Sequence, residues 1–244
     1  MKKKLKSIKR ALWVLVPMLI GFSLFFSNLF IKRLYPSKIW LHRCNNLALL
    51  DFAASRYSGI EVDVVYYDDL EVLEVNHPPD ERSHLFLDDY LILLREGEFQ
   101  MIWLDLKNLE DSNAKRISLF LASLCEEYQV NSRNIIVESP RADLLDLFSN
   151  LDFRTSFYLP YGWHTKSLEE QNEILESIEV MHKASKTDFL SLDYHEYPQI
   201  REYFPNDSLL VWHTLYGELN PLEARYLLYK IVQDARVKAV LLSK

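Results

Sequence analysis

The sequence predicts an α/β protein, a (β/α)8 barrel of the TIM type preceded by one N-terminal transmembrane helix. Short runs rich in β-branched and aromatic residues alternate with amphipathic helical patterns, which is typical of βα units around a parallel sheet. The length of 244 residues fits one such barrel, and neither a Ser/Gly-rich linker nor an internal repeat indicates a second domain. A charge-free stretch near the start is long enough to cross a bilayer.

The N-terminal segment has the features of a membrane anchor. Residues 11–31 carry no charged side chain, and a helix rising about 1.5 Å per residue would span a hydrocarbon core of roughly 30 Å over that length. Six Lys or Arg lie within residues 1–10, against Lys32 and Arg33 after the run. We therefore expect a cytoplasmic basic tail (1–10), an uncleaved signal anchor (11–31) and a linker (32–37). A cleaved signal peptide is the alternative, but no small-residue cleavage site follows the run.

The remaining residues, 38–244, are expected to form a barrel domain on the extracytoplasmic side of a single-pass membrane protein. Residues 1–36 hold eight Lys or Arg and no acid, which leaves 20 basic against 35 acidic residues and a formal charge of −15. Such a charge repels phosphate backbones, so nucleic acid is excluded as an expected partner. An anionic small molecule would need a local cation or a metal for its capture.

Nine runs have the composition of strands, one more than a barrel needs. Because only Asp68 and Asp69 separate the second run from the third, we expect those two to form one barrel strand followed by an extra strand or extended loop. A doubly wound open sheet is the alternative fold, but no Gly-rich turn follows the first strand. The expected strands are residues 38–42, 60–66, 70–76, 100–106, 134–138, 155–159, 189–193, 209–214 and 238–242. The expected helices are 47–57, 87–95, 142–149, 168–184 and 199–203, with two more around residues 117–124 and 228–235.

Polar residues gather where these strands end, which is where the active site of a β/α barrel lies. His42 follows the first strand. Glu61 and Asp63 stand two apart in the second, so both carboxylates share one face. Two acids that face one way in an apolar strand imply a cation beside them, and a hard divalent metal fits best.

The next strands extend this set. Asp105 and Lys107 share a face and would add a third oxygen ligand and a phosphate clamp, although alone they would serve equally well as a structural ion pair. His77 follows the surplus run, and the prolines after it allow the alternative of a rigid turn. Two histidines with a metal supply a general base, a general acid and a charge stabiliser for attack on phosphorus. Trp212 can stack against an organic group, whereas Glu138 and Tyr158 are interpreted as lining or core.

The ordered motifs resemble those of the phospholipase-C-like phosphodiesterase barrels, which include the glycerophosphodiester phosphodiesterases. The matching elements are His42-Arg43, Glu61-Val62-Asp63, His77 and Asp105-Leu106-Lys107. Those enzymes usually have Gly and Asp where this chain has Cys44 and Pro78, and Glu where it has Asp105. Within the superfamily, the chain more closely resembles the menorin family (family with sequence similarity 151), through His42–Asn45, Glu61–Val64, His77-Pro78-Pro79 and Leu104–Lys107.

The resemblance implies a function. Glu61, Asp63 and Asp105 would bind one divalent cation, Mg²⁺ or Ca²⁺, and His42 and His77 would do the acid/base catalysis. Phosphate and substrate would be held by Arg43, Asn45, Lys107 and Trp212. We expect a membrane-anchored phosphodiesterase, a hydrolase or a cyclising lyase, acting on a glycerophosphodiester or phospholipid head group.

Two other functions are weighed against this one. A non-catalytic metal- or ligand-binding barrel of the menorin type is the main alternative. A metal-dependent amidohydrolase is disfavoured, because His-x-His is absent from the first strand.

Overall fold

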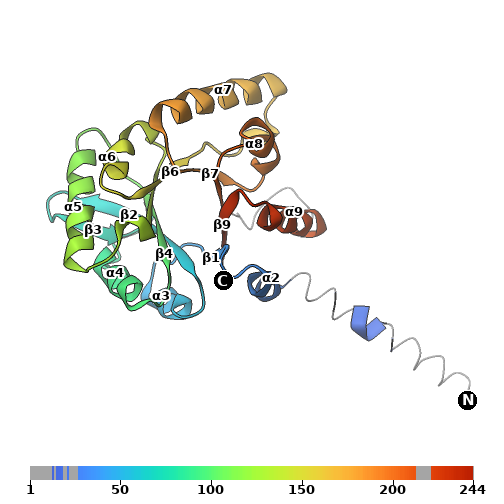
Figure 1. Cartoon of the computed structure of the whole chain (residues 1–244), viewed down its shortest axis with the longest axis horizontal. Coiled ribbons are helices and arrows are strands. Elements are labelled where there is room, and N and C mark those ends of the chain that lie inside the picture. Colours follow the sequence, from blue (N-terminus) through green and yellow to red (C-terminus); the bar gives the residue numbers. More distant parts are fainter. Residues whose placement is uncertain (1–12, 14, 19–20, 22–26, 213–220, 244) are drawn as a thin grey trace, which may run out of the picture.

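In the computed structural model, the described residues are 13, 15–18, 21, 27–212 and 221–243. Within them, eight parallel strands close into a barrel, in the order β1-β9-β8-β7-β6-β5-β4-β2, with β1 pairing β2 through Leu41 and Ile60. Figure 1 shows this ring with the helices around its outside. The TIM-type fold expected from the sequence is confirmed. The strands are β1 (Ile39–Leu41), β2 (Gly59–Tyr67), β3 (Val72–Val75), β4 (Met101–Leu106), β5 (Ile135–Ser139), β6 (Arg154–Tyr158), β7 (Phe189–Asp193), β8 (Leu209–Trp212) and β9 (Val237–Leu242).

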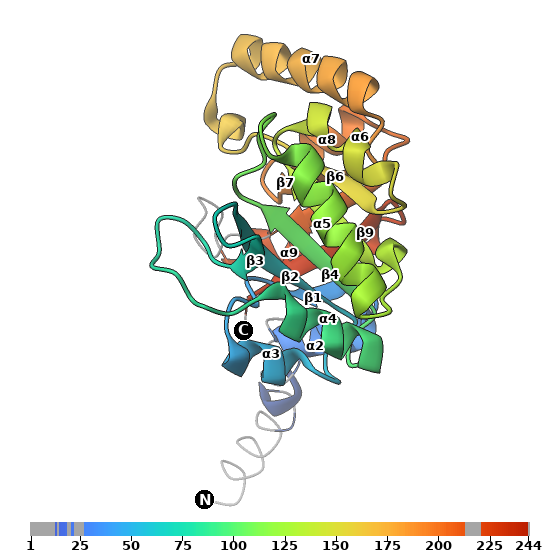
Figure 2. The same ribbon diagram turned by 90° about the vertical axis from the view of Figure 1, so that its left-hand side faces the viewer.

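Strand β3 is the one strand that is not part of the eight-stranded parallel barrel. It runs antiparallel to β2, with Val64 opposite Val75 and Tyr67 opposite Val72, and it pairs with no other named strand. The hairpin and the loop that follows it stand out at one end of the barrel (Figure 2). The expected arrangement of a barrel strand followed by an extra strand is therefore confirmed.

The helices lie in the gaps between strands, close to their expected positions. In α5 the buried side chains Ile117, Leu121 and Leu124 face the sheet, as the helical period of the sequence indicates. A capping box fixes the start of α7, because Ser167 and Glu170 each accept from the other's backbone N–H. The helices are α2 (Asn28–Leu34), α3 (Leu47–Ala53), α4 (Leu87–Glu96), α5 (Ala114–Glu127), α6 (Asp146–Ser149), α7 (Leu168–Ser185), α8 (Tyr197–Tyr203) and α9 (Pro221–Gln233).

Indole rings help fill the floor of the barrel. Trp40, Trp103 and Trp212 belong to one cluster of inward-facing side chains, separate from the two clusters between sheet and helices. A Cβ on Gly59 would come within 2.4 Å of the Trp40 ring, so only glycine fits at the start of β2. Alternation along β2 then points Glu61 and Asp63 inward above this floor.

The helix α2 packs on the barrel. Ile31 is fully buried among apolar side chains of the outer wall, and Asn28 Oδ1 accepts from Arg225 Nη1 of α9 at 2.9 Å. The end of the expected anchor and the start of the expected linker therefore form one helix against the wall. Ten of residues 11–31 and all of residues 1–10 lie outside the described residues, as do residues 213 and 214 of the expected eighth strand. In the described parts of the chain, no helix combines the length and the apolarity needed to cross a membrane.

Candidate active site

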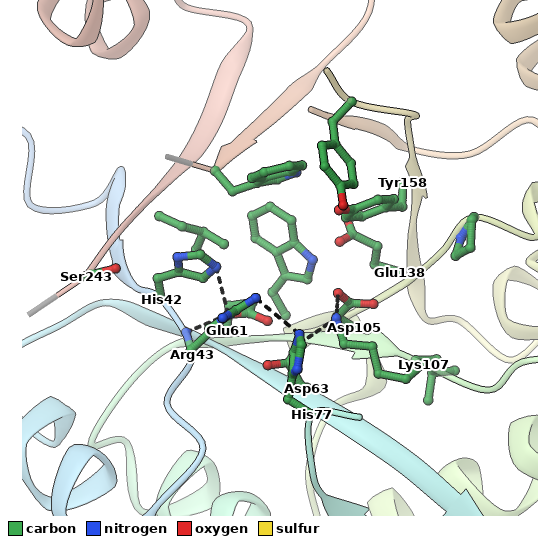
Figure 3. A pocket seen from close by; sticks show the side chains of 16 residues that line it. His42, Arg43, Glu61, Asp63, His77, Asp105, Lys107, Glu138, Tyr158 and Ser243 are labelled. Atoms are coloured by element: carbon green, nitrogen blue, oxygen red, sulfur yellow. Dashed lines mark hydrogen bonds and ion pairs between the residues drawn. The ribbon is translucent and has the colours of Figure 1, made fainter. Parts of the chain in front are cut away.

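One cavity of about 540 Å³ opens at the carboxyl ends of the strands. Figure 3 shows Glu61, Asp63, Asp105 and Lys107 in the lower part of the view, with Glu138 and Tyr158 together above them. Eight of the nine predicted site residues line it, and Asn45 is the exception. The lining residues are His42, Arg43, Glu61, Asp63, His77, Trp103, Asp105, Leu106, Lys107, Glu138, Pro140, Tyr158, Tyr161, Trp212, Leu241 and Ser243.

The three acids predicted to bind metal come together. Asp63 of β2 lies in register with Asp105 of β4, and Glu61 is two residues earlier on the inward face. One oxygen from each carboxylate lies within 4.8 Å of the others. Their residues are only 3%, 1% and 7% exposed. Three buried, converging carboxylates repel one another, so they need positive charge between them.

Lys107 supplies part of that charge. Its Nζ lies 2.6 Å from Asp63 Oδ1 and also bonds Asp105. Burial alone would lower the pKa of Lys107, but Asp105 and Asp63 outweigh burial and raise it. Burial, followed by the charges of Asp63 and Asp105, raises the pKa of Glu61 well above its usual range. Burial also raises the pKa of Asp105, although Lys107 opposes the shift. One ammonium therefore only partly balances three acids.

The loop after β1 places two predicted residues beside Glu61. The backbone N–H of Arg43 donates to Glu61 Oε2 at 2.6 Å, and His42 Nε2 lies 3.8 Å from the same oxygen. Arg43 has φ +50°, a left-handed conformation that costs a non-glycine residue about 1–2 kcal/mol. The turn is held from below, because Cys44 N–H donates to Glu61 O at 2.8 Å and Cys44 O accepts from Tyr90 at 2.6 Å.

Asn45, predicted to bind substrate, instead contacts Asp63. Its Nδ2 donates to Asp63 Oδ2 at 2.5 Å, and its Oδ1 accepts from the Asp63 backbone N–H at 3.0 Å. Both ends of the amide are thereby used on one residue. The geometry is that of a side chain that fixes the orientation of a buried carboxylate.

The loop after β3 carries His77, and the buried Glu74 anchors that loop. Glu74 Oε2 accepts from Arg82 Nε at 2.9 Å and Nη2 at 2.5 Å, while Glu74 Oε1 accepts from His84 N–H at 3.0 Å. The later part of the loop, from Arg82 to His84, is thus tied back to β3. His77 then reaches the cavity, where its Nε2 lies 3.1 Å from Arg43 Nη2.

A fourth acid, Glu138, was not predicted as a site residue. It lies at the end of β5 in register with Asp105, is 2% exposed, and accepts from Ser156 Oγ at 3.1 Å. Burial, and then the charge of Asp105, raises the pKa of Glu138 well above its usual range. The sequence did indicate that the Glu138 side chain faces the inside of the barrel, because its position in the alternation along β5 matches that of Asp105 in β4. A lone acid at a strand end does not distinguish a site residue from a wall residue.

Comparisons with known proteins bear on the fold. No family model and no curated protein matches the sequence. A glycerophosphodiester phosphodiesterase from Parabacteroides distasonis superposes with a TM-score of 0.57 at 15% identity, over 84% of this chain and 92% of that one. An Oleispira antarctica phosphodiesterase in complex with the product sn-glycerol-3-phosphate gives 0.56 at 11% identity, over 86% and 94%.

The barrel is also shared with a different enzyme. N-(5'-phosphoribosyl)anthranilate isomerase from Pyrococcus furiosus superposes with a TM-score of 0.52 at 15% identity, over 84% of this chain and 87% of that one. These likenesses establish the β/α barrel and its similarity to phosphodiesterase barrels. They do not establish the menorin-like branch. Because one fold hosts many activities, function rests on the site itself.

Proposed function

We propose that this chain is a metal-dependent phosphodiesterase that acts on a glycerophosphodiester or a phospholipid head group. The observation that carries the proposal is the convergence of Glu61, Asp63 and Asp105 in a cavity that also holds two histidines and two cationic side chains. Carboxylate oxygens suit a hard divalent cation, and Arg and Lys suit phosphate.

The donor set fits one divalent cation. Three carboxylates and the Lys107 ammonium carry a net charge of −2, which Mg²⁺ or Ca²⁺ would balance. The residues that would hold the ion are Glu61, Asp63 and Asp105, with Asn45 orienting Asp63. When bound, such an ion would stabilise negative charge on the phosphate oxygens. Lys107 lies beside the same acids and would contact the phosphate from the β4 side.

The acid and base are assigned to the two histidines. His42 projects from the β1 loop and His77 from the β3 loop, so the cavity receives imidazoles from two different segments. One would accept the proton of the attacking hydroxyl and the other would donate a proton to the leaving alcohol. Arg43 would hold the phosphate between them. An attacking hydroxyl within the substrate would give a cyclic phosphate, and water would give the hydrolysed product.

The membrane part of the proposal rests on the sequence. We propose that the part of the uncharged run 11–31 that precedes α2 anchors the chain in a bilayer, with residues 1–10 in the cytoplasm and the barrel outside, because this run is uncharged and basic residues precede it. A lipid-derived substrate would suit an enzyme held at a bilayer surface.

The test is turnover by the full chain, purified in a maltoside detergent, on a panel of glycerophosphodiesters and lysophospholipids. We expect phosphodiester cleavage that stops with a chelator, returns with Mg²⁺ or Ca²⁺, and is lost in His42→Ala. The control is His84→Asn, which changes an exposed histidine away from the cavity. If the chain binds a divalent cation but cleaves no diester, the function is instead that of a non-catalytic metal- or ligand-binding barrel of the menorin type.

A further inference from the structure

Two neighbouring helices of the outer wall expose apolar side chains. Leu29 of α2 is 74% exposed, and Leu222 and Tyr226 of α9 are 55% and 59% exposed. The hydrogen bond from Arg225 to Asn28 joins the two helices, so Leu29 and Tyr226 each directly follow a bonded residue. Leu222 and Tyr226 are four residues apart and share one side of α9. Single exposed apolar side chains are ordinary, whereas a group of them marks an interaction surface. We call this surface the α2–α9 face.

The charge of the α2–α9 face differs from that of the rest of the barrel. Residues 27–37 contain two basic side chains and no acid, and Glu223 is the single acid of α9. Lys230 Nζ lies 4.5 Å from the centre of the Tyr226 ring, so a cation and an aromatic ring stand together at the surface. The residues after 36 carry a formal charge of −15, which makes a basic and apolar face a local exception. Such a face complements a bilayer that contains anionic lipids.

The uncharged run leads directly onto this face. Ser27 is the N-cap of α2, with extended backbone angles (φ −80°, ψ 122°), and its side chain accepts from the Phe30 N–H. A non-helical residue here breaks any continuous helix from the run into α2, so only residues 11–26 are available to cross a bilayer. Sixteen helical residues rise about 24 Å, about 6 Å less than a hydrocarbon core of roughly 30 Å. A segment this short holds its flanking residues at the bilayer boundary.

The α2–α9 face adjoins the mouth of the cavity. β1 and β9 are paired neighbours, α2 precedes β1, and α9 precedes β9. Figure 1 shows both helices on one side of the ring, with α5 across from them. His42 after β1 and Ser243 after β9 line the cavity. A bilayer against α2 and α9 would therefore lie nearest to this part of the mouth.

We propose that the α2–α9 face rests on the bilayer, with Leu29 and Tyr226 at head-group level, so that a diester reaches the His42 side of the mouth from the membrane. This inference rests on the membrane part of the proposed function and adds which face of the barrel contacts lipid. Interfacial helices bury their apolar side chains about 5–10 Å into the boundary between head groups and acyl chains. Tyrosine and basic side chains are favoured in the same zone.

The test places one fluorescent label at a time on the full chain in nanodiscs that each hold one copy. Cys44 and Cys125 are buried, so a thiol-reactive nitrobenzoxadiazole label reports on an introduced cysteine. The labelled variants are Leu29→Cys, Tyr226→Cys and, as the matched control, Leu119→Cys, which changes an exposed leucine of α5. The unsubstituted chain controls for labelling of the native cysteines. The discs contain phosphatidylcholine and phosphatidylglycerol, with a nitroxide near the top of some acyl chains that quenches labels at the bilayer.

We expect the labels at positions 29 and 226 to be quenched at least about twice as strongly as the label at position 119. Replacing phosphatidylglycerol with phosphatidylcholine should lower the quenching at position 226, because the basic side chains of the face then lose their attraction to the lipid. Lys230→Glu should lower it in the same way in the anionic discs.

The outcomes separate this inference from the proposed function. Equal quenching at all three positions, or none at 29 and 226, overturns the lipid-facing role while the anchor stands. Labels at 29 and 226 that are shielded from iodide in the water but not quenched by lipid would show that the chain covers its own face, which also overturns the proposal. A chain that does not elute with the discs overturns both the anchor and the face. Because no readout uses turnover, phosphodiester cleavage is judged independently.

Discussion

Arg43 Nη2 lies 3.1 Å from His77 Nε2, across the mouth of the cavity. A guanidinium has only donors, so in this contact Nε2 of His77 is the acceptor. In this arrangement the nitrogen that points into the cavity is already engaged. An arriving phosphate would attract Arg43 more strongly than an imidazole does, and would thereby release His77 for proton transfer.

Replacing Arg43 should separate its role in phosphate binding from the backbone strain at its position. We expect Arg43→Ala and Arg43→Gly each to lower kcat/KM for a phosphodiester by about 10–100-fold, mainly through KM, because a charged hydrogen bond to phosphate is lost. The two variants should differ in stability, with the glycine more stable by about 1 kcal/mol, since φ +50° strains an alanine. Steady-state kinetics and thermal unfolding measure the two effects. Unchanged kinetics in both variants would remove Arg43 from the phosphate site.

Asp105→Asn should weaken the metal site. The substitution removes one of three converging carboxylates while it keeps the shape of the side chain. We expect the affinity for Mg²⁺ or Ca²⁺, measured by titration calorimetry, to fall by about 10–100-fold. Glu173→Gln on the exposed face of α7 is the matched control and should leave affinity unchanged. Equal affinity in the two variants would show that any ion binds elsewhere.

Lys107→Met should strengthen metal binding, whereas Asp105→Asn weakens it. In chelator, the variant loses the ammonium that bonds Asp63 and Asp105, and we expect its Tm to fall by about 5–10 °C. A saturating divalent cation should restore most of that loss, with tighter binding than in the wild type, because no ammonium competes for the acids. Lys183→Met, at an exposed pair on α7, controls for loss of a surface charge. A Tm deficit that persists with metal would indicate a packing role for the lysine stem.

Glu74→Gln should make stability depend less on pH. Burial alone would raise the pKa of Glu74, but hydrogen bonds from Arg82 and from the His84 N–H outweigh burial and lower it. Because the folded pKa lies below the unfolded value of about 4.3, the carboxylate stabilises the fold above that value and the contribution is lost as pH falls. We expect the variant's Tm to be several degrees lower at pH 7 and to approach that of the wild type near pH 3.

The matched control for this prediction is Glu81→Gln, an exposed acid on the same loop. It should follow the wild type at every pH. A constant difference between Glu74→Gln and the wild type from pH 7 to pH 3 would contradict the assignment. Loss of turnover in Glu74→Gln would further link this anchor to the placement of His77.

The barrel could be predicted from the sequence because its strands alternate with periodic helices, and the acid cluster because period two fixes which residues share a face. To predict that Glu61, Asp63 and Asp105 lie together, it is enough to know the alternation of side chains along a strand and the rule that barrel sites lie at strand ends. The contact of Asn45 could not be predicted in this way, because only the folded loop shows that its amide turns onto Asp63 and not toward the cavity. Residues 28–31 belong to an apolar run in which a membrane helix and a helix packed on a protein wall look alike.

The packing of α2 has a practical consequence for where the chain can be cut. Ile31 fills a position in the outer wall and Asn28 is bonded to Arg225, so a recombinant barrel that starts at residue 37 would leave that wall open. A protein started at Ser27 would keep the helix and its N-terminal cap. The same holds for limited proteolysis. Cleavage before Ser27 would leave an intact barrel, whereas cleavage after Leu34 would expose its apolar side.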